Sequence, residues 1–325
     1  MRKTAGIFFG IIIGIQSLSA GNALLFNGIN EYVQLSEAVP VGSSSNTVEM
    51  WVKVPEIGNG NLEENERVGV ILGNFGSSPN ANWEIHAQGE IRMYWNGGNP
   101  DIKGTTDLRD DTWHHIAFVR DKGNDRIQAY IDGQLEFDHE GCGSDVIFST
   151  SPRIGNDNRP TGNPYFHGEI DELRIWNTAR TQSQIREYMC EDVSSESGLV
   201  AYYPMSDGSG TALSDNAGTN TGTLVNMDNS NWTGDHLVPE GDGGTTPYRI
   251  KSLNHLYWAS ANSSTWNSDF EQIADIDASP TADWNGGAGF SPIGTNAANF
   301  FGSYDGAGFT ITGLTVDRAS ENYIG

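Results

Sequence analysis

The ten residues RIQAYIDGQL (126–135) carry the clearest local signal about the fold. The first six largely alternate apolar and polar residues, which is the period of a strand that buries one face. Asp132-Gly133 follows, a dipeptide favoured in two-residue hairpin turns because both positions need a positive φ angle. Gln134 and Leu135 then start a second strand. The stretch therefore predicts an antiparallel β-hairpin.

Strand-like stretches of the same kind fill the chain from residue 21 to 177. They are EYVQL (31–35), TVEMWVKV (47–54), VGVILGNF (68–75), WEIHAQ (83–88), EIRMYW (90–95), WHHIAFVR (113–120) and EIDELRIW (169–176). They are rich in Val, Ile, Tyr and Trp, and Gly, Asn, Asp or Pro separates them. About eight strands at this spacing predict an all-β fold, a two-sheet antiparallel jelly-roll sandwich.

The chain changes character after residue 177. TARTQSQIREYM (178–189) predicts a helix, and GLVAYYPM (198–205) predicts another strand. The low-complexity stretch VPEGDGGTTP (238–247) is typical of a linker, so we expect one domain over 21–237 and a second region over 248–325.

The second region begins with a possible helix in 252–266. Short apolar segments between Gly-Asp turns follow it, as in the rungs of a β-solenoid. Only one or two rungs are present, so we expect a short, incomplete β-solenoid-like region.

Residues 1–20 have the pattern of a secretory signal peptide. Arg2 and Lys3 precede the apolar run AGIFFGIIIGIQSL, and small residues surround a possible cut after Ala20. The alternative, a membrane anchor, would need about 20 apolar residues. We therefore expect the mature chain outside the cell, either secreted or at a bacterial cell surface.

The chain is strongly acidic, with 18 Lys and Arg against 42 Asp and Glu and a net charge of −24. Removing Arg2 and Lys3 leaves 16 positive side chains against 42 negative ones, or −26. Such a surface repels phosphate backbones and anionic headgroups, so nucleic acid and membrane insertion are not expected. Acidity does suit a solvated extracellular protein, and carboxylates are calcium ligands.

The chain has two cysteines, Cys142 and Cys190. An oxidising compartment would allow them to form one disulfide, but spacing alone leaves the pairing open. There is no C-x-x-C pattern, so a thiolate zinc site is not expected.

Five segments together resemble the laminin-G-like and pentraxin-like jelly-roll domains of the concanavalin A-like superfamily. They are FNGINEYVQL, TVEMWVKV, TWHHIAFVRD, IQAYIDGQL and FHGEIDELRIWNTARTQSQI, and they cover about residues 22–190. Farther on, ADIDAS, GFSPIG and FFGSYDGAGFTITGL resemble the start of the GLUG-type repeat regions of bacterial surface proteins.

The acidic run in EIDELRIW raises the question of catalysis, since the same E-I-D opening begins the catalytic strand of laminarinase-type hydrolases. Glycoside hydrolysis needs two carboxyl groups that face one bond. Strict alternation puts Asp171 with Leu173 on one face and Glu172 with Arg174 on the other. Leu173 and Arg174 stand where those hydrolases have the second glutamate. No catalytic residue is expected, and the domain is predicted not to be an enzyme.

The resemblance implies another role for Asp171, as ligand of a structural calcium ion near the chain start. Oxygens from around Asn27 and Gly28 would complete the site. The alternative is a carboxylate paired with Arg174 or with a neighbouring strand.

Two groups of residues are candidates for binding a ligand. The loop that holds Asp157 and Asn158 resembles the pentraxin loop that supplies calcium ligands, although Arg159 replaces a further acid, and an ordinary turn loop is the alternative. Trp83, Tyr94 and Trp95 lie near Gly- and Asn-rich turns and are candidates for an exposed aromatic patch. His114 and His115 are neighbours on a strand, so they face opposite ways and do not suggest a shared metal.

These features predict a non-catalytic extracellular binding or adhesion module. The predicted ligand is a glycan or a cell-surface protein, and calcium is the predicted cofactor. Two alternatives remain: an accessory domain of a secreted polysaccharide-degrading enzyme, or a structural spacer without a ligand.

Overall fold

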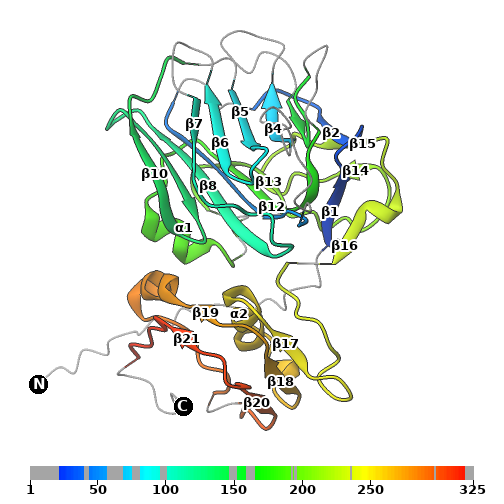
Figure 1. Cartoon of the computed structure of the whole chain (residues 1–325), viewed down its shortest axis with the longest axis vertical. Helices are drawn as coiled ribbons and strands as arrows, with labels where there is room; N and C mark the ends of the chain where they lie inside the picture. Colours follow the sequence, from blue (N-terminus) through cyan, green and yellow to red (C-terminus); the bar gives the residue numbers. More distant parts are fainter. Residues whose placement is uncertain are drawn as a thin grey trace, which may run out of the picture.

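The computed structural model describes residues 22–39, 44–56, 69–74, 81–95, 101–145, 152–158, 165–191, 193, 196–234, 236–295 and 298–318. The predicted signal, residues 1–20, lies outside this part of the chain. Two large antiparallel sheets pack face to face, and a smaller C-terminal unit lies below them (Figure 1). The sandwich agrees with the fold class predicted from the sequence.

The first sheet, called sheet A, has the strand order β10-β9-β8-β3-β12-β1-β16, with β13 beside the second half of β12. Its strands are β1 (Asn22–Asn27), β3 (Asn46–Lys53), β8 (Trp113–Asp121), β9 (Arg126–Ile131), β10 (Gln134–Glu140), β12 (His167–Trp176), β13 (Leu199–Tyr203) and β16 (Trp232–Gly234).

The second sheet, called sheet B, has the order β14-β15-β2-β11-β4-β5-β6-β7. Its strands are β2 (Tyr32–Leu35), β4 (Gly69–Asn74), β5 (Ala81–Ile85), β6 (Ile91–Trp95), β7 (Asp101–Lys103), β11 (Arg153–Ile154), β14 (Ala212–Leu213) and β15 (Gly222–Val225). β13, β14, β15 and β16, which follow residue 198, thus join the same two sheets as the strands before them.

The core lies between the inner faces of the sheets. Its largest fully buried apolar side chains include Phe26, Trp83, Phe118 and Phe166. The rings of Phe26 and Phe166 meet edge to face at 6.0 Å. Each such side chain stabilises the fold by about 1.5–3 kcal/mol relative to an exposed one, so this apolar layer holds the two sheets together.

The predicted hairpin at 126–135 is confirmed. β9 pairs with β10 antiparallel, with Ile131 opposite Gln134. Asp132 and Gly133 have φ angles of 48° and 71°, the left-handed values that a type I′ turn requires.

The helix predicted over 178–189 forms as the shorter α1 (Gln182–Tyr188). Thr181 caps its first turn: the Thr181 hydroxyl accepts from the Gln184 amide, and the Gln184 side chain accepts from the Thr181 amide. The C-terminal unit contains α2 (Leu253–Ala261), and short 3₁₀ helices occur at η1 (Asn229–Asn231), η2 (Ser263–Thr265) and η3 (Ser279–Gly287).

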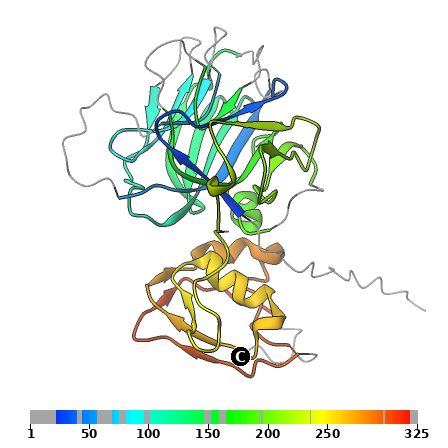
Figure 2. The same ribbon diagram turned by 90° about the vertical axis from the view of Figure 1, so that its right-hand side faces the viewer.

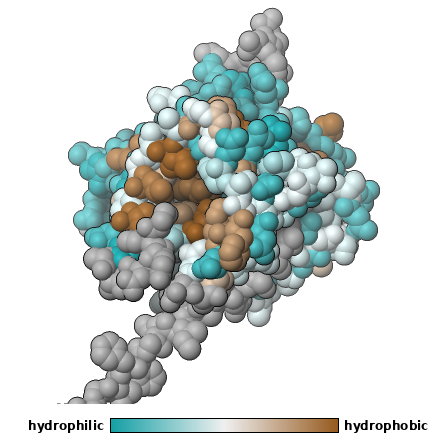
Figure 3. Space-filling model, turned by 90° about the horizontal axis from the view of Figure 1, so that it is seen from below, coloured by the Kyte–Doolittle hydropathy of each residue, from teal (hydrophilic) through white to brown (hydrophobic). Residues whose placement is uncertain are grey.

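The C-terminal unit is built from parallel strands. β17 (Tyr248–Ile250), β18 (Asp269–Gln272) and β20 (Ser303–Asp305) form one sheet, and β19 (Ile276–Asp277) pairs with β21 (Ile311–Thr312). Successive strands pair in parallel after a long connection, which is the arrangement of stacked solenoid rungs. Seen from below, this unit shows apolar surface (Figure 3), and its exposed apolar residues are Phe301, Phe309, Leu314 and Val316.

The C-terminal unit packs against the outer face of sheet A (Figure 2). One apolar cluster contains Trp51 of β3 together with Leu237, Leu256 and Trp284. The Trp284 indole N–H donates to the Arg186 carbonyl of α1 at 2.5 Å, and the Arg186 guanidinium pairs with Asp283 at 3.1 Å. The unit is therefore joined to the sandwich by packing as well as by the chain. Among the described residues no helix is long and apolar enough to cross a bilayer.

Candidate functional site

The acidic strand β12 contains a bulge at Glu172, whose φ angle is +53°. Asp171 lies opposite Trp51 of β3, whereas the next paired residue, Arg174, lies opposite Glu49. The extra residue shifts the alternation, so Leu173 and Ile175 face the core while Asp171, Glu172 and Arg174 lie on the outer side of sheet A. The prediction that Asp171 and Glu172 face opposite ways is therefore wrong.

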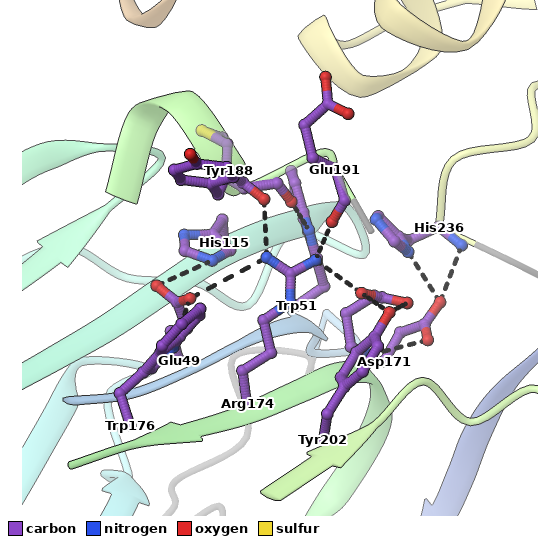
Figure 4. Close-up of polar contacts among 12 residues, drawn as sticks. Glu49, Trp51, His115, Asp171, Arg174, Trp176, Tyr188, Glu191, Tyr202 and His236 are labelled. Atoms are coloured by element: carbon purple, nitrogen blue, oxygen red, sulfur yellow. Dashed lines mark hydrogen bonds and ion pairs between the residues drawn. The ribbon is translucent and has the colours of Figure 1, made fainter. Parts of the chain in front are cut away.

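Each carboxylate of this strand has a partner inside the molecule, and Figure 4 shows the contacts of Asp171. Asp171 accepts from the Glu172 amide at 2.8 Å and meets His236 Nδ1 at 2.7 Å. Glu172 pairs with Arg174 at 2.6 Å and accepts from the Tyr202 hydroxyl at 2.7 Å. Glu169 accepts from the Thr233 hydroxyl at 2.6 Å. The three carboxylates of β12 therefore form contacts that stabilise the fold.

Arg174 stands at the centre of this polar network, with 1% of its surface exposed. Its guanidinium also donates to the backbone carbonyls of Tyr188 at 2.7 Å and Glu191 at 2.8 Å. Burial alone would lower the pKa of Arg174, but the charges of Glu172 and other neighbours raise it above the ordinary value. Arg174 therefore carries a permanent buried charge that ties β12 to the segment after α1.

Trp51 joins the network to the C-terminal unit. Its indole stacks on the His236 ring at 4.7 Å, meets the His115 ring edge-on at 5.4 Å and donates to the Met189 carbonyl at 2.9 Å. Burial, and after it the positive charge of Arg174, lowers the pKa of His115 well below its usual value, so this ring is neutral. The Asn254 amide of α2 donates to the His236 carbonyl. The network is therefore covered by the C-terminal unit.

His114 faces a different environment from His115. Its Nδ1 lies 2.7 Å from Asp132 and its Nε2 lies 3.1 Å from Asp110. Burial opposes the charged form, but hydrogen bonds and charges from Asp132 and Asp110 raise the pKa of His114 to about 9. The ring is thus held as a cation between two carboxylates.

This pKa sets an expected pH dependence. The folded-state pKa of about 9 exceeds the unfolded value near 6.5, so His114 stabilises the fold fully below pH 6.5 and loses that contribution as pH rises toward 9. We expect the difference in urea midpoint between wild type and His114→Gln to shrink over this window. Asp132→Asn should weaken the same dependence, and parallel profiles for wild type and His114→Gln would contradict the assignment.

The residues predicted to share a calcium site are not brought together. Asn27 lies opposite His167, four residues along β12 from Asp171, a separation of about 13 Å. The Asn27 side-chain oxygen Oδ1 instead accepts from the Ile29 and Asn30 backbone amides within a turn, and Gly28 has a φ angle of 73° there. Among the described residues, no three His, Cys, Asp or Glu side chains gather in a way that could hold a metal ion. Calcium binding stays a prediction, but Asp171, Asn27 and Gly28 are not one site.

The possible disulfide is not formed. Cys142 and Cys190 are both free and buried. Cys142 belongs to the core between the sheets, whereas Cys190 belongs to the cluster on the outer side of sheet A. Pairing is wrong because the sheet separates the two thiols. Burial raises the pKa of both.

A different set of polar residues forms one row across the outer face of sheet B. Consecutive register partners run from β2 to β6: Gln34, Arg153, Gly73, Asn82 and Tyr94. Their strand neighbours, such as Val33, Ile154 and Trp83, point into the core. The row therefore presents planar amide, guanidinium and phenol groups side by side, which is the chemistry that recognises polar ligands.

The middle of the row is a buried hydrogen-bonded cluster. The Asn82 amide donates to Asp157 at 3.0 Å and to Glu84 at 3.2 Å, and Glu84 pairs with Arg92 at 2.9 Å. Asn82, Glu84 and Asp157 are fully buried. Asn82 and Asp157 can lie this close to β4 because residue 73 is a glycine. A Cβ there would lie 2.7 Å from Asn82 Oδ1 and 2.8 Å from Asp157 Cβ.

The predicted ligand residues have different outcomes. Asp157 and Tyr94 both adjoin Asn82, so the structure brings these two together. Asn158 follows Asp157 in the same loop and is half-buried. Trp83 is fully buried in the core, so its placement in an exposed aromatic patch is wrong. Trp83 lies on the same, inward face of β5 as Ala81 and Ile85. The Trp95 side chain and Arg159 lie outside the described residues.

Three important residues were missed by the sequence reading. Glu49 is an acid in the middle of the apolar strand TVEMWVKV, which is a usable sign of a buried charge pair. Asn82 could have been assigned to the outer face by alternation. His236 follows the last strand of the sandwich, and no local pattern distinguishes it.

The comparison with protein families agrees with this architecture. Residues 27–186 match the model of the family described as the concanavalin A-like lectin/glucanases superfamily. Among solved structures, the chain is similar to a candidate carbohydrate-binding protein from Bacteroides ovatus, with a TM-score of 0.53 and 21% identity over 66% of this chain and 62% of that chain. At this identity the likeness concerns the fold alone.

Two sequence relatives match shorter segments. The chain is 42% identical over 86 residues to halomucin of Haloquadratum walsbyi, covering 25% of this chain and 1% of halomucin. It is 39% identical over 93 residues to a candidate Gly-rich membrane protein of Evansella cellulosilytica, covering 28% of this chain and 10% of that protein. The chain therefore matches only a small part of either relative. Residues 27–186 thus match the model of this superfamily and fold as a two-sheet sandwich.

Proposed function

We propose that this chain is a non-catalytic, exported binding module whose ligand is a glycan, bound at the outer face of sheet B. The observation that carries the proposal is the row from Gln34 to Tyr94, whose Asn82 adjoins two residues expected to bind a ligand, Tyr94 and Asp157. Sugars present hydroxyl groups that need paired donors and acceptors, and an aromatic ring supports their apolar faces. The row offers both kinds of contact.

The half-buried members of the row and the buried cluster around Asn82 have separate roles in this proposal. Asn82, Glu84 and Asp157 form a rigid base because they are fully buried and bonded to one another. Gln34, Arg153 and Tyr94 are half-buried and rise above it. A base with locked rotamers keeps such contact groups in place before a ligand arrives, which lowers the entropic cost of binding.

The arrangement on β12 supports a non-catalytic module. Hydrolysis needs two carboxyl groups facing a substrate. Asp171, Glu172 and Glu169 are instead engaged with His236, Arg174 and Thr233. Asp171 and its neighbours also lie beneath the C-terminal unit, away from sheet B. The signal-like residues 1–20 support export.

A glycan array tests the proposal with the full-length mature chain, with calcium and with EDTA. We expect binding to at least one polysaccharide class, and we expect Tyr94→Ala to weaken it by about tenfold, since loss of a stacking ring costs roughly 1–3 kcal/mol. Phe309→Ala, an exposed aromatic on the C-terminal unit, is the matched control and should bind like wild type. Absence of binding to every glycan in both buffers would reject the proposal. Loss of binding in EDTA would support the predicted calcium.

A further inference from the structure

Arg153 of β11 differs from most arginines of this acidic protein. Arg92, Arg109, Arg126, Arg174 and Arg186 each pair with a carboxylate at 3.1 Å or less. In the described part of the chain, no carboxylate lies within salt-bridge distance of Arg153. A half-buried cation without a counter-ion is unusual in a chain of net charge −24, because carboxylates are abundant on its surface.

Neutral groups hold Arg153 in place. Its Nε donates to Gln34 Oε1 at 3.0 Å, and its Nη1 donates to Asn156 Oδ1 at 3.1 Å. The guanidinium also lies over the Tyr32 ring, 4.2 Å from its centre. No hydrogen bond of Nη2 to a described residue is found. The guanidinium is therefore oriented by three neighbours, while its charge has no carboxylate partner among the described residues.

Asn156 supplies a second unused donor at the same place. It is fully buried, and its Nδ2 has no hydrogen-bond partner among the described residues. The amide cannot be turned round, because Arg153 only donates and so needs Oδ1 facing it. A buried donor without a partner costs stability, so Asn156 Nδ2 needs an acceptor, which a water molecule or a ligand oxygen can supply.

We propose that Arg153 and Asn156 bind the anionic group of an acidic glycan, either a uronate carboxylate or a sulfate. The inference rests on the proposed glycan-binding function of sheet B. A guanidinium and an amide both donate, and a planar fork suits carboxylate and sulfate oxygens. Arg153 lies three strands from Tyr94, about 14 Å across the sheet, so one oligosaccharide can place its acid on Arg153 and a neutral ring on Tyr94.

The test compares the mature wild type with Arg153→Gln on three immobilised polysaccharide sets: neutral, uronate-bearing and sulfated. We expect wild type to bind an acidic set more tightly than the neutral one, with binding that weakens as NaCl rises. Arg153→Gln should lose about 10- to 100-fold on that set, as expected for charge-assisted hydrogen bonds, and a smaller factor on the neutral set, where no anionic group meets the guanidinium. Arg153→Lys should keep only part of the affinity for the acidic set, because lysine has the positive charge but lacks the planar, two-pronged guanidinium.

Controls separate this inference from the proposed function. Arg126→Gln removes an arginine paired with Asp138 on sheet A and should bind like wild type. Circular dichroism and melting curves establish that each variant is folded. Equal acidic-glycan binding by wild type and folded Arg153→Gln, or a wild-type preference for neutral glycans, overturns the acidic specificity alone. No glycan binding by wild type rejects the proposed function itself. The uronate and sulfate sets show which anion is bound.

Discussion

Asp171→Ala is expected to lower the free energy of unfolding by about 3–5 kcal/mol, the usual cost of breaking a buried polar pair. The change removes the acceptor of the His236 ring and of the Glu172 amide in the bulge. Both lie where water does not reach, since Asp171 and His236 are 2% and 1% exposed. Urea denaturation followed by circular dichroism measures the loss.

Two companion variants make this experiment specific. Asp317→Ala removes an exposed carboxylate of the C-terminal unit and should change stability by less than about 0.5 kcal/mol. The double variant Asp171→Leu with His236→Phe should recover much of the loss, because an apolar pair needs no hydrogen bonds. A loss below 1 kcal/mol for Asp171→Ala would show that the pair is not important for stability.

The same variant tests the calcium prediction. A calcium ion that binds only the folded protein must raise its melting temperature. If Asp171 were a ligand, that rise would disappear in Asp171→Ala. In the structure Asp171 pairs with His236, so we expect any calcium-dependent rise in melting temperature to be the same in wild type and Asp171→Ala.

Trp284→Ala is expected to cost about 3–5 kcal/mol and to loosen the C-terminal unit from the sandwich. Trp284 is 4% exposed, packs edge-on against Tyr257 at 5.6 Å and donates to the Arg186 carbonyl of α1. Its removal leaves a cavity and an unsatisfied carbonyl at the contact between η3 and α1. Scanning calorimetry should then show the single transition of wild type split or broadened.

The matched control for this variant is Phe301→Ala. Phe301 is an aromatic residue of the same unit, but 74% of its surface is exposed. Its replacement should change stability by no more than about 0.5 kcal/mol. An unchanged calorimetric profile for Trp284→Ala would mean that the two parts are held together by the chain connection alone.

Several features of the site were within reach of the sequence and others were not. Trp83 could have been placed in the core, because Ala81 and Ile85 share its phase along β5. The bulge at Glu172 could not have been predicted, because it arises from the pairing of β12 with β3. It interrupts the two-residue alternation that is used to assign side chains to one face of a strand. The separation of Cys142 and Cys190 likewise depends on which side of sheet A each thiol occupies.

By itself, the sequence determined the two-sheet sandwich, the hairpin at Asp132-Gly133 and a helix within 178–189. These follow from alternation, turn chemistry and a run without Gly or Pro, which act over a few neighbouring residues. Tertiary structure alone decided that His236 pairs with Asp171 and that, within the described part of the chain, Arg153 contacts neutral groups. Such partners come from strands and loops that are distant in the chain. Long-range packing brings them together, and no local sequence pattern indicates it.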